Sequence, residues 1–235
     1  MGSLELVRGI DRFCLWITDD DLEEALEIDA IRKRVDLCRD IRSTMKDAGG
    51  RKLAERPHQF RDQLTPEHHA IFVPRVTSER RPYLPFDRVG SDTISSDLNQ
   101  VLYDAPDWCM SLIASRLHIV WIGTVCGRLE SRFRYSNTLG WNTFPVPNFT
   151  EDQHAALTKS AMSILRCRLT HHPKTIAELY DPEKMPDDLR AAHQANDDLL
   201  ESMYIGRTFR NDTERLEHLF KLYAARVKKL KKGAA

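Results

Sequence analysis

The sequence predicts a mixed α/β (α+β) domain over residues 1–147, followed by an all-α helical bundle over residues 148–235. Two observations indicate this division. The first part contains short apolar runs interrupted by proline, which are typical of strands at the edges of sheets. After Pro147 the apolar residues recur with a helical period. A chain of 235 residues is long enough for two modest domains.

The first expected elements are a strand and a long helix. Residues 12–17 form a short aromatic and branched run, which suits a buried strand. Between residues 22 and 45, apolar side chains recur at helical spacing after an acidic stretch. The pair Gly49 and Gly50 is expected to end this helix.

A central strand and a buried helix are expected next. Residues 70–74 are apolar and predict a strand, and residues 101–103 predict a shorter one. The prolines among residues 74–86 favour an edge strand or a loop. A single helical stripe then predicts the buried helix of the first domain; it consists of Cys109, Leu112, Ile113, Leu117, Val120 and Trp121.

The second domain begins after an extended segment. Residues 144–147 alternate with proline and close the first domain in extended form. Thr150 and Gln153 then form a capping-box pattern at the start of a helix. Further helices are expected over residues 186–204 and 211–230, so this part is predicted to be a small helical bundle.

The charges balance but are segregated along the chain. There are 35 basic and 35 acidic residues, so net charge neither demands nor excludes a nucleic-acid partner. Residues 19–29 carry seven carboxylates and no base, whereas residues 32–56 and 75–88 are mostly basic. A segregated neutral protein can present one positive face to phosphates, although solvated helix surfaces produce the same runs.

Cysteine usage and hydropathy indicate the compartment. The five cysteines are odd in number and show no Cys-x-x-Cys pair, so we expect reduced core residues. No apolar run is long enough to cross a bilayer, and the start of the chain lacks a secretory pattern. A bacterial cytoplasmic location without membrane attachment is therefore expected.

The sequence contains no convincing catalytic set. It has no Gly-x-Gly loop after a strand, no Asn-Pro-Pro-Tyr motif, no Gly-x-Ser-x-Gly motif and no Walker loop. The histidine pairs at residues 68–69 and 171–172 lack further ligands at a recognisable spacing. We therefore expect no catalytic residue, bound cofactor or metal in this chain.

The most informative short pattern is Glu130-x-Arg132-x-Arg134. In an extended backbone, alternation would place all three side chains on one side. Arginine suits O6 and N7 of guanine, and glutamate can accept a hydrogen bond from N4 of cytosine, so such a row could read base edges. A surface ladder of salt bridges between Glu130 and its arginines is the alternative.

A second group consists of cationic and hydroxyl side chains near a predicted strand. Arg75, Ser78, Arg80 and Arg81 follow residues 70–74 and offer donors of the kind that contact phosphates. An ordinary solvated loop explains the same composition. Arg128, beside the Glu130 pattern, is expected to join them in contacting a DNA backbone.

Several segments, in order along the chain, resemble the C-terminal third of MmeI-like restriction-modification adenine methyltransferases (Type IIL or IIG). Residues 142–147 read Asn-Thr-Phe-Pro-Val-Pro, similar to that family's Asn-Asn-Phe-Pro-Trp-Pro, with Thr143 and Val146 as departures. The other similar segments are residues 12–17, 73–81, 104–106, 115–118, 126–131, 134–138, 179–182, 185–189 and 192–194.

The resemblance implies a DNA target-recognition domain followed by a helical C-terminal domain. In this family an upstream domain binds S-adenosylmethionine and methylates adenine, and residues matching Glu130, Arg132 and Arg134 are associated with base choice. Asn99 is a further candidate base reader. The partners implied are double-stranded DNA and the methyltransferase domain of a parent enzyme, whose catalytic motifs are absent from these residues.

A protein-interaction module of a larger bacterial assembly is the alternative function. In that case the segregated charges and the C-terminal bundle would bind partner chains, and the arginines would be salt-bridged surface. A continuous basic concavity would favour DNA, whereas an exposed apolar patch would favour a protein partner.

Overall fold

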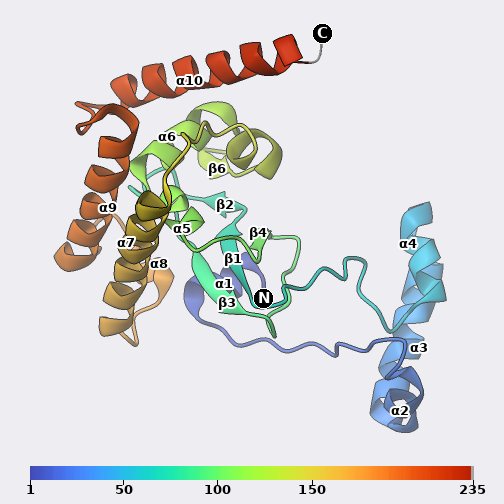
Figure 1. The fold of residues 1–235 in the computed structure, drawn as a ribbon. Coiled ribbons are helices and arrows are strands. Elements are labelled where there is room, and N and C mark those ends of the chain that lie inside the picture. Colours follow the sequence, from blue (N-terminus) through green and yellow to red (C-terminus); the bar gives the residue numbers. More distant parts are fainter. Residues whose placement is uncertain (234–235) are drawn as a thin grey trace. The chain divides into compact units, whose positions relative to one another are not determined.

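The computed structural model describes the backbone of residues 1–233 and the side chains of residues 1–231. It divides into two compact units. Unit 1 comprises residues 1–11 together with the chain from Pro66 onward, and unit 2 comprises Arg12–Thr65. Figure 1 shows the elements of both units. None of the described helices combines the length and apolarity needed to span a membrane.

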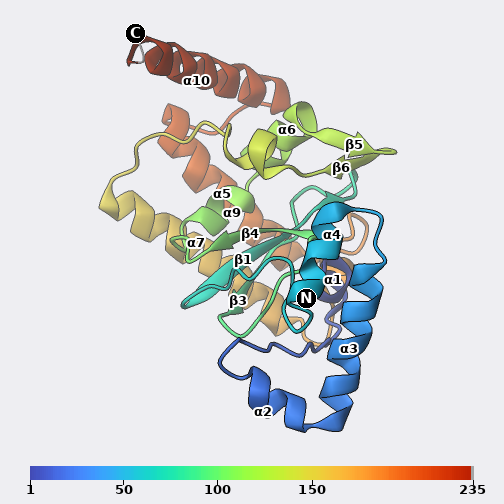
Figure 2. The same cartoon turned by 90° about the vertical axis from the view of Figure 1, so that its right-hand side faces the viewer.

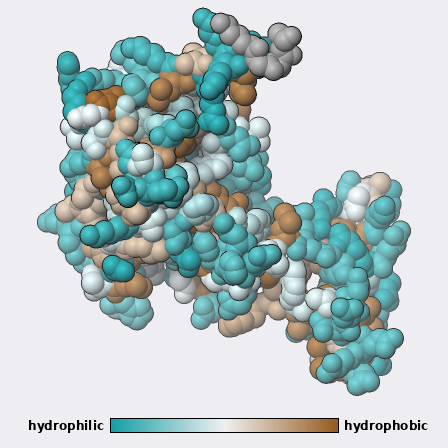
Figure 3. Space-filling view, viewed as in Figure 1, coloured by the Kyte–Doolittle hydropathy of each residue, from teal (hydrophilic) through white to brown (hydrophobic). Residues whose placement is uncertain are grey.

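Unit 2 is helical, and its apolar side chains are largely exposed. Its elements are α2 (Leu22–Glu27), α3 (Asp29–Ser43), α4 (Ala48–Lys52) and the short helix η1 (Leu53–Glu55). Among its hydrophobic residues, Ile17 and Val35 are buried. Brown apolar patches interrupt its teal surface in Figure 3. The exposed large hydrophobic residues of unit 2 are Phe13, Leu15, Trp16, Ile28, Leu37, Ile41, Met45, Phe60 and Leu64.

Three expectations for this region were wrong. Residues 12–17 form no strand, because none of the described residues pairs with them in a ladder. The long predicted helix is interrupted at Ile28, whose extended backbone (ψ 108°) separates α2 from α3. Gly49 and Gly50 lie inside α4, which Asp47 caps by accepting a hydrogen bond from Gly50 N at 2.6 Å.

Unit 1 begins with α1 (Ser3–Arg8) and a three-stranded antiparallel sheet. The strand order is β3-β1-β4, formed by Asp87–Gly90, His69–Pro74 and Asn99–Tyr103. Because β1 is central, its residues pair on both sides; Ile71 lies opposite Arg88 and Leu102. The predicted strands at 70–74 and 101–103 are therefore present, and the apolar run in β1 is explained by its burial.

The rest of unit 1 consists of helices and a second small sheet. The predicted helix of residues 109–121 is divided in two, because Ser115 caps a new helix by accepting from His118 N. The elements in chain order are β2 (Val76–Thr77), α5 (Cys109–Ile113), α6 (Arg116–Val125), β5 (Gly127–Leu129), β6 (Arg132–Arg134), η2 (Asn137–Trp141), α7 (Glu151–Thr170), α8 (Ile176–Leu179), α9 (Asp187–Ile205) and α10 (Asp212–Gly233).

Unit 1 contains a large hydrophobic core and a smaller cluster of Leu6, Ala70 and Phe72. The large core includes Ile71 of β1, Leu117 of α6, Leu157 of α7, Leu200 of α9 and Leu219 of α10. α7 and α9 lie side by side in Figure 1 and contact each other extensively. Residues from both predicted domains therefore share one core. The predicted domain boundary itself stays a prediction.

Buried polar groups join α6 to the C-terminal helices. Asp197 of α9 accepts hydrogen bonds from Tyr83 Oη at 2.9 Å and from Arg116 N at 2.7 Å. Glu201, also on α9, pairs with Arg215 Nε at 2.7 Å. Burial raises the pKa of Asp197 to about 7 despite these donors.

Two buried histidines each pair with a tyrosine. His118 Nε2 lies 3.0 Å from Tyr135 Oη, and His193 Nε2 lies 2.8 Å from Tyr180 Oη. Burial disfavours the charged imidazolium and lowers the pKa of both histidines to about 3. Both rings are therefore neutral hydrogen-bonding groups at ordinary pH.

We expect the free energy of unfolding to fall as the pH is lowered from about 6.5 towards 4. The unfolded chain protonates His118 and His193 near pH 6.5, whereas the folded chain does so near pH 3. Asp197 acts in the opposite direction. Its pKa of about 7 means that the folded chain carries a proton on this carboxyl in a pH range where the unfolded chain does not, so one of the two extra protons on the unfolded chain is balanced. The net difference of one proton lowers stability by about 1.4 kcal/mol per pH unit. Urea denaturation across this range measures it, and a flat or inverted profile would contradict the expectation.

Candidate functional site

The Glu130-x-Arg132-x-Arg134 segment lies in a β-hairpin. β5 and β6 are antiparallel, and their register pairs Leu129 with Arg132, so Glu130 and Ser131 form a two-residue turn. Figure 2 shows this hairpin at the edge of unit 1, beside α6. The expectation that Glu130 continues the extended row was wrong. Its φ of 58° lies in the left-handed region, which two-residue hairpin turns require at their first central position.

The two faces of β6 have different surroundings. Arg132 and Arg134 lie on one face and are exposed, while Phe133 between them points to the other. The ring of Phe133 lies against Gly123 of α6, where a Cβ would be 3.1 Å from its Cζ atom. Phe133 therefore fixes the inward face of the strand on α6. Arg132 and Arg134, on the outward face, are exposed and do not pack against α6.

The two arginines differ in their partners. Arg132 Nη2 pairs with Glu130 Oε2 at 2.7 Å, with side chains 45% and 77% exposed. This is the salt bridge that the sequence left open as an alternative. An exposed pair of this kind contributes about 0.2–1 kcal/mol, so a ligand can replace it at little cost. The side chain of Arg134 makes no hydrogen bond or ion pair with another described residue.

Arg128 lies across the hairpin from Phe133. Its guanidinium carbon is 4.9 Å from the centre of the Phe133 ring, and Nη1 donates to Ser131 O at 2.8 Å. It therefore lies on the face of the hairpin opposite to Arg132 and Arg134. Its position beside the turn remains exposed to solvent.

The loop with the other predicted phosphate contacts begins next to the hairpin. β2 pairs with β6, with Thr77 opposite Phe133, and completes a sheet of order β2-β6-β5. The following Ser78 accepts a hydrogen bond from Arg80 N at 3.2 Å and shapes the loop. The exposed Arg80 pairs with Glu183 Oε1 at 2.6 Å, in the segment between α8 and α9.

Two of the arginines predicted to contact phosphates donate hydrogen bonds from their guanidinium groups to other residues of this chain. Arg81 Nη1 donates to Thr77 Oγ1 at 3.1 Å, and burial lowers the pKa of Arg81. Arg75 Nη1 donates to Asp97 O at 2.9 Å. Both side chains therefore help to hold the backbone around β2.

Asn99 lies apart from this group, at the start of β4. It is 7% exposed, its Nδ2 donates to Met1 O at 3.1 Å, and its Oδ1 accepts from Ser3 Oγ at 3.0 Å. The residues at the start of the chain thus occupy both ends of its amide. A contact between Asn99 and a base would require these hydrogen bonds to be exchanged, and its role as a base reader stays a prediction.

Sequence reasoning missed Glu79 and Tyr135. A hydrogen bond from its own backbone, a hydrogen bond from Ser131 and the charges of Arg128 and Arg80 lower the pKa of Glu79, so this loop carboxylate lies among the candidate cations. No spacing in the sequence indicates that contact, because it depends on how the β2 loop meets the hairpin turn. Tyr135 follows Arg134 directly, and its aromatic ring beside a charged strand was the available signal.

Tyr135 anchors the end of β6. It is 1% exposed, its N donates to Arg75 O at 2.7 Å, and its O accepts from Gln100 Nε2 at 3.3 Å. Its ring lies so close to Gly140 in η2 that a Cβ there would be 2.9 Å from Cε2. The backbone that leaves the hairpin is therefore held on several sides.

Gly140→Ala should destabilise unit 1 by about 1–3 kcal/mol, because the added methyl group meets the Tyr135 ring and Cys126 Sγ, which would lie 3.1 Å away. Gly127→Ala is the matched control, since no atom lies within 4 Å of a Cβ there. It should change stability by less than about 0.5 kcal/mol. Urea denaturation of both variants measures the difference, and equal effects would contradict the tight packing at Gly140.

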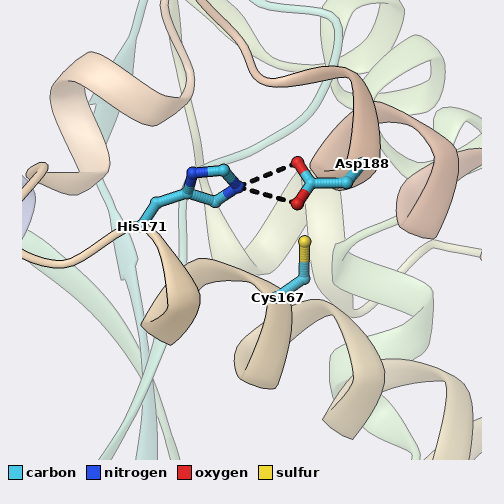
Figure 4. A group of neighbouring side chains, drawn as sticks. All are labelled: Cys167, His171 and Asp188. Carbon is cyan, nitrogen blue, oxygen red and sulfur yellow. Dashed lines mark hydrogen bonds and ion pairs between the residues drawn. The ribbon is translucent and has the colours of Figure 1, made fainter.

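One other cluster brings together potential metal ligands. Cys167 and His171 lie at the end of α7, and Asp188 lies in the first turn of α9; their donor atoms are all within 4.8 Å of one another. In Figure 4 the His171 ring points at the Asp188 carboxylate, with Nε2 at 2.8 and 2.9 Å from its two oxygens. These hydrogen bonds lower the pKa of Asp188. The arrangement joins two helices through hydrogen bonds, and the expected absence of a metal stays a prediction.

Two family models together match residues 1–231. The model described as "MmeI, target recognition domain" matches residues 1–148, and the model described as "MmeI, C-terminal domain" matches residues 149–231. The chain belongs to the MmeI family. The resemblance inferred from the ordered motifs is thereby confirmed.

Two relatives in this family match nearly the whole chain. "DNA methyltransferase A" of Bacillus subtilis (strain 168) is 38% identical over 223 residues, which are 95% of this chain and 25% of the relative. The solved structure of the Type IIL restriction-modification enzyme MmeI in complex with DNA matches with 30% identity and a TM-score of 0.92. That match covers 97% of this chain and 30% of the MmeI chain. The predicted fold class is confirmed, and this chain spans about a quarter of the curated relative.

Proposed function

We propose that this chain recognises a short sequence in duplex DNA and supplies the specificity of a restriction-modification methyltransferase. The observation that carries the proposal is the outward face of β6, where Arg132 and Arg134 are exposed while Phe133 fixes the strand on α6. Membership of the MmeI family supports it, because the matching structure of MmeI is a complex with DNA.

A hairpin with two outward arginines suits the major groove of DNA. The groove admits a two-stranded ribbon, and each arginine can donate two hydrogen bonds to O6 and N7 of guanine. Arg134 has no partner to release among the described residues. Glu130 can exchange its exposed pairing with Arg132 for the N4 amino group of cytosine.

Contacts to the DNA backbone come from residues around the hairpin. We assign them to Arg80 and Arg128, whose guanidinium groups are exposed, together with the hydroxyl group of Ser78. Arg75 and Arg81 support this surface by holding the backbone near β2. Such contacts weaken with salt, so we expect modest and salt-sensitive binding by the chain alone.

Methyl transfer belongs to the remainder of the parent enzyme in this proposal. The relatives are three to four times longer than the matched region, and one is named a DNA methyltransferase. S-adenosylmethionine binding and adenine methylation are therefore assigned to a separate methyltransferase domain that acts as a partner of this chain. The chain itself is proposed to bind DNA without turnover.

The exposed apolar residues of unit 2 favour protein binding as an additional function. With Ile17 and Val35 as its buried hydrophobic residues, this unit has too little core for a stable domain of its size. A surface of this kind suits contact with another folded domain. The methyltransferase domain is the partner that agrees with DNA recognition by unit 1.

Selection from a pool of randomised duplexes at low salt tests the main proposal. We expect the chain to enrich one short sequence and fluorescence anisotropy to show tighter binding to it than to unrelated duplexes. Failure to enrich any sequence, with no anisotropy change at low salt, would refute sequence recognition by this chain.

Arg132→Ala and Arg134→Ala should each relax the preference at one base position by about 5- to 150-fold, because a bidentate contact to a base contributes about 1–3 kcal/mol of discrimination. Arg80→Ala is the matched control and should weaken binding to all sequences alike. Anisotropy titrations with the selected site and its single-base variants measure both effects. Unchanged preferences in the two hairpin variants would remove the site assignment.

A further inference from the structure

Tyr135 connects the candidate reading strand to the buried helix behind it. It directly follows Arg134, and its backbone is hydrogen-bonded to Arg75 and Gln100. Its hydroxyl group crosses to α6 and meets His118 Nε2 at 3.0 Å. The end of β6 is thus tied to the same helix on which the ring of Phe133 lies through Gly123.

The orientation of the His118 ring is fixed by packing contacts that do not involve Tyr135. Its ring is fully buried and lies edge-on to Phe144, with ring centres 4.7 Å apart and planes at 89°. Trp141 packs against it in a similar way at 5.8 Å. Among the described residues, His118 Nδ1 has no hydrogen-bond partner, so Tyr135 supplies the one hydrogen bond of this imidazole.

We propose that Tyr135 is a positioning residue for sequence recognition, whose hydrogen bond to His118 sets the direction in which Arg134 and Arg132 point. The inference rests on the proposed function of β6. Bidentate contacts require a geometry held within about 0.5 Å, and a three-residue strand in a small three-stranded sheet cannot hold it alone. Phe133 holds the middle of the strand on α6, and Tyr135 holds its end.

Tyr135→Phe tests the proposal, and Tyr180→Phe is its matched control. Each variant removes one buried tyrosine hydroxyl group that pairs with Nε2 of a buried histidine, at 3.0 and 2.8 Å. Tyr180 follows α8, so its pair lies outside the hairpin. Both variants should lose comparable stability in urea. Only Tyr135→Phe should lower the affinity ratio between the selected duplex and its single-base variants, by about fivefold.

Hydrogen exchange of the backbone amides provides a readout that needs no DNA. In Tyr135→Phe the amides of β5 and β6 should exchange faster than in the parent chain, because the end of β6 is released. In Tyr180→Phe they should be unchanged. If the two variants match in both base preference and hairpin exchange, Tyr135 has only a structural role and the proposal is overturned.

Substitutions at His118 separate the hydrogen bond from the packing. His118→Gln keeps a polar group near the position of Nε2, whereas His118→Leu fills the space without one. We expect base preference to be kept better in the glutamine variant, and equal loss in both variants would overturn the proposal.

The arginine variants separate this inference from the proposed function. If the chain enriches no sequence, the proposed function fails, and if Arg132→Ala and Arg134→Ala leave base preference unchanged, the assignment of base reading to β6 fails. If they relax it while Tyr135→Phe behaves like Tyr180→Phe, only the positioning role fails.

Discussion

The packing of α6 against both α10 and the hairpin is the constraint on which the candidate site depends. Trp121 packs against Phe220 and Tyr223 of α10, with ring centres 5.1 and 5.8 Å apart. Elsewhere on the helix, Gly123 contacts Phe133 of β6 and His118 pairs with Tyr135, which directly follows the strand. A helix held in this way cannot shift without opening the core, so the hairpin inherits a rigid support. The C-terminal helices therefore contribute to the geometry of a surface that they do not form.

Much of the fold could be predicted because its patterns are local. The capping box at Thr150 and Gln153 is formed, and the helical periods that follow it correspond to α7, α9 and α10. The central strand β1 was recognisable as a short apolar run. The predictions that failed are those that depend on which distant residues a segment pairs with, and a local sequence pattern does not contain that information. Residues 12–17 have the composition of a strand, but they pair with no strand in the part of the chain that the structure describes.

The candidate site was only partly predictable for the same reason. Alternation correctly placed Arg132 and Arg134 on one face of β6. It could not show that the strand begins after Glu130, because a left-handed glutamate in a tight turn is unusual and depends on hairpin register. The pairing of Arg80 with Glu183 joins residues 103 positions apart, which no single-sequence pattern encodes. Tyr135 was missed because its hydrogen bond with His118 joins residues 17 positions apart, which the alternation of the charged row does not reveal.

The alternation of β6 also has an evolutionary consequence. Positions 132 and 134 face solvent, while positions 133 and 135 are packed on α6. Exchanges at the outward pair cost little folding stability, since exposed substitutions usually change it by less than about 0.5 kcal/mol. A lineage can therefore vary the chemistry that this strand offers while the inward pair preserves its path. The outward side chains of the hairpin can therefore be exchanged, and new preferences can arise there, without compensating changes in the core.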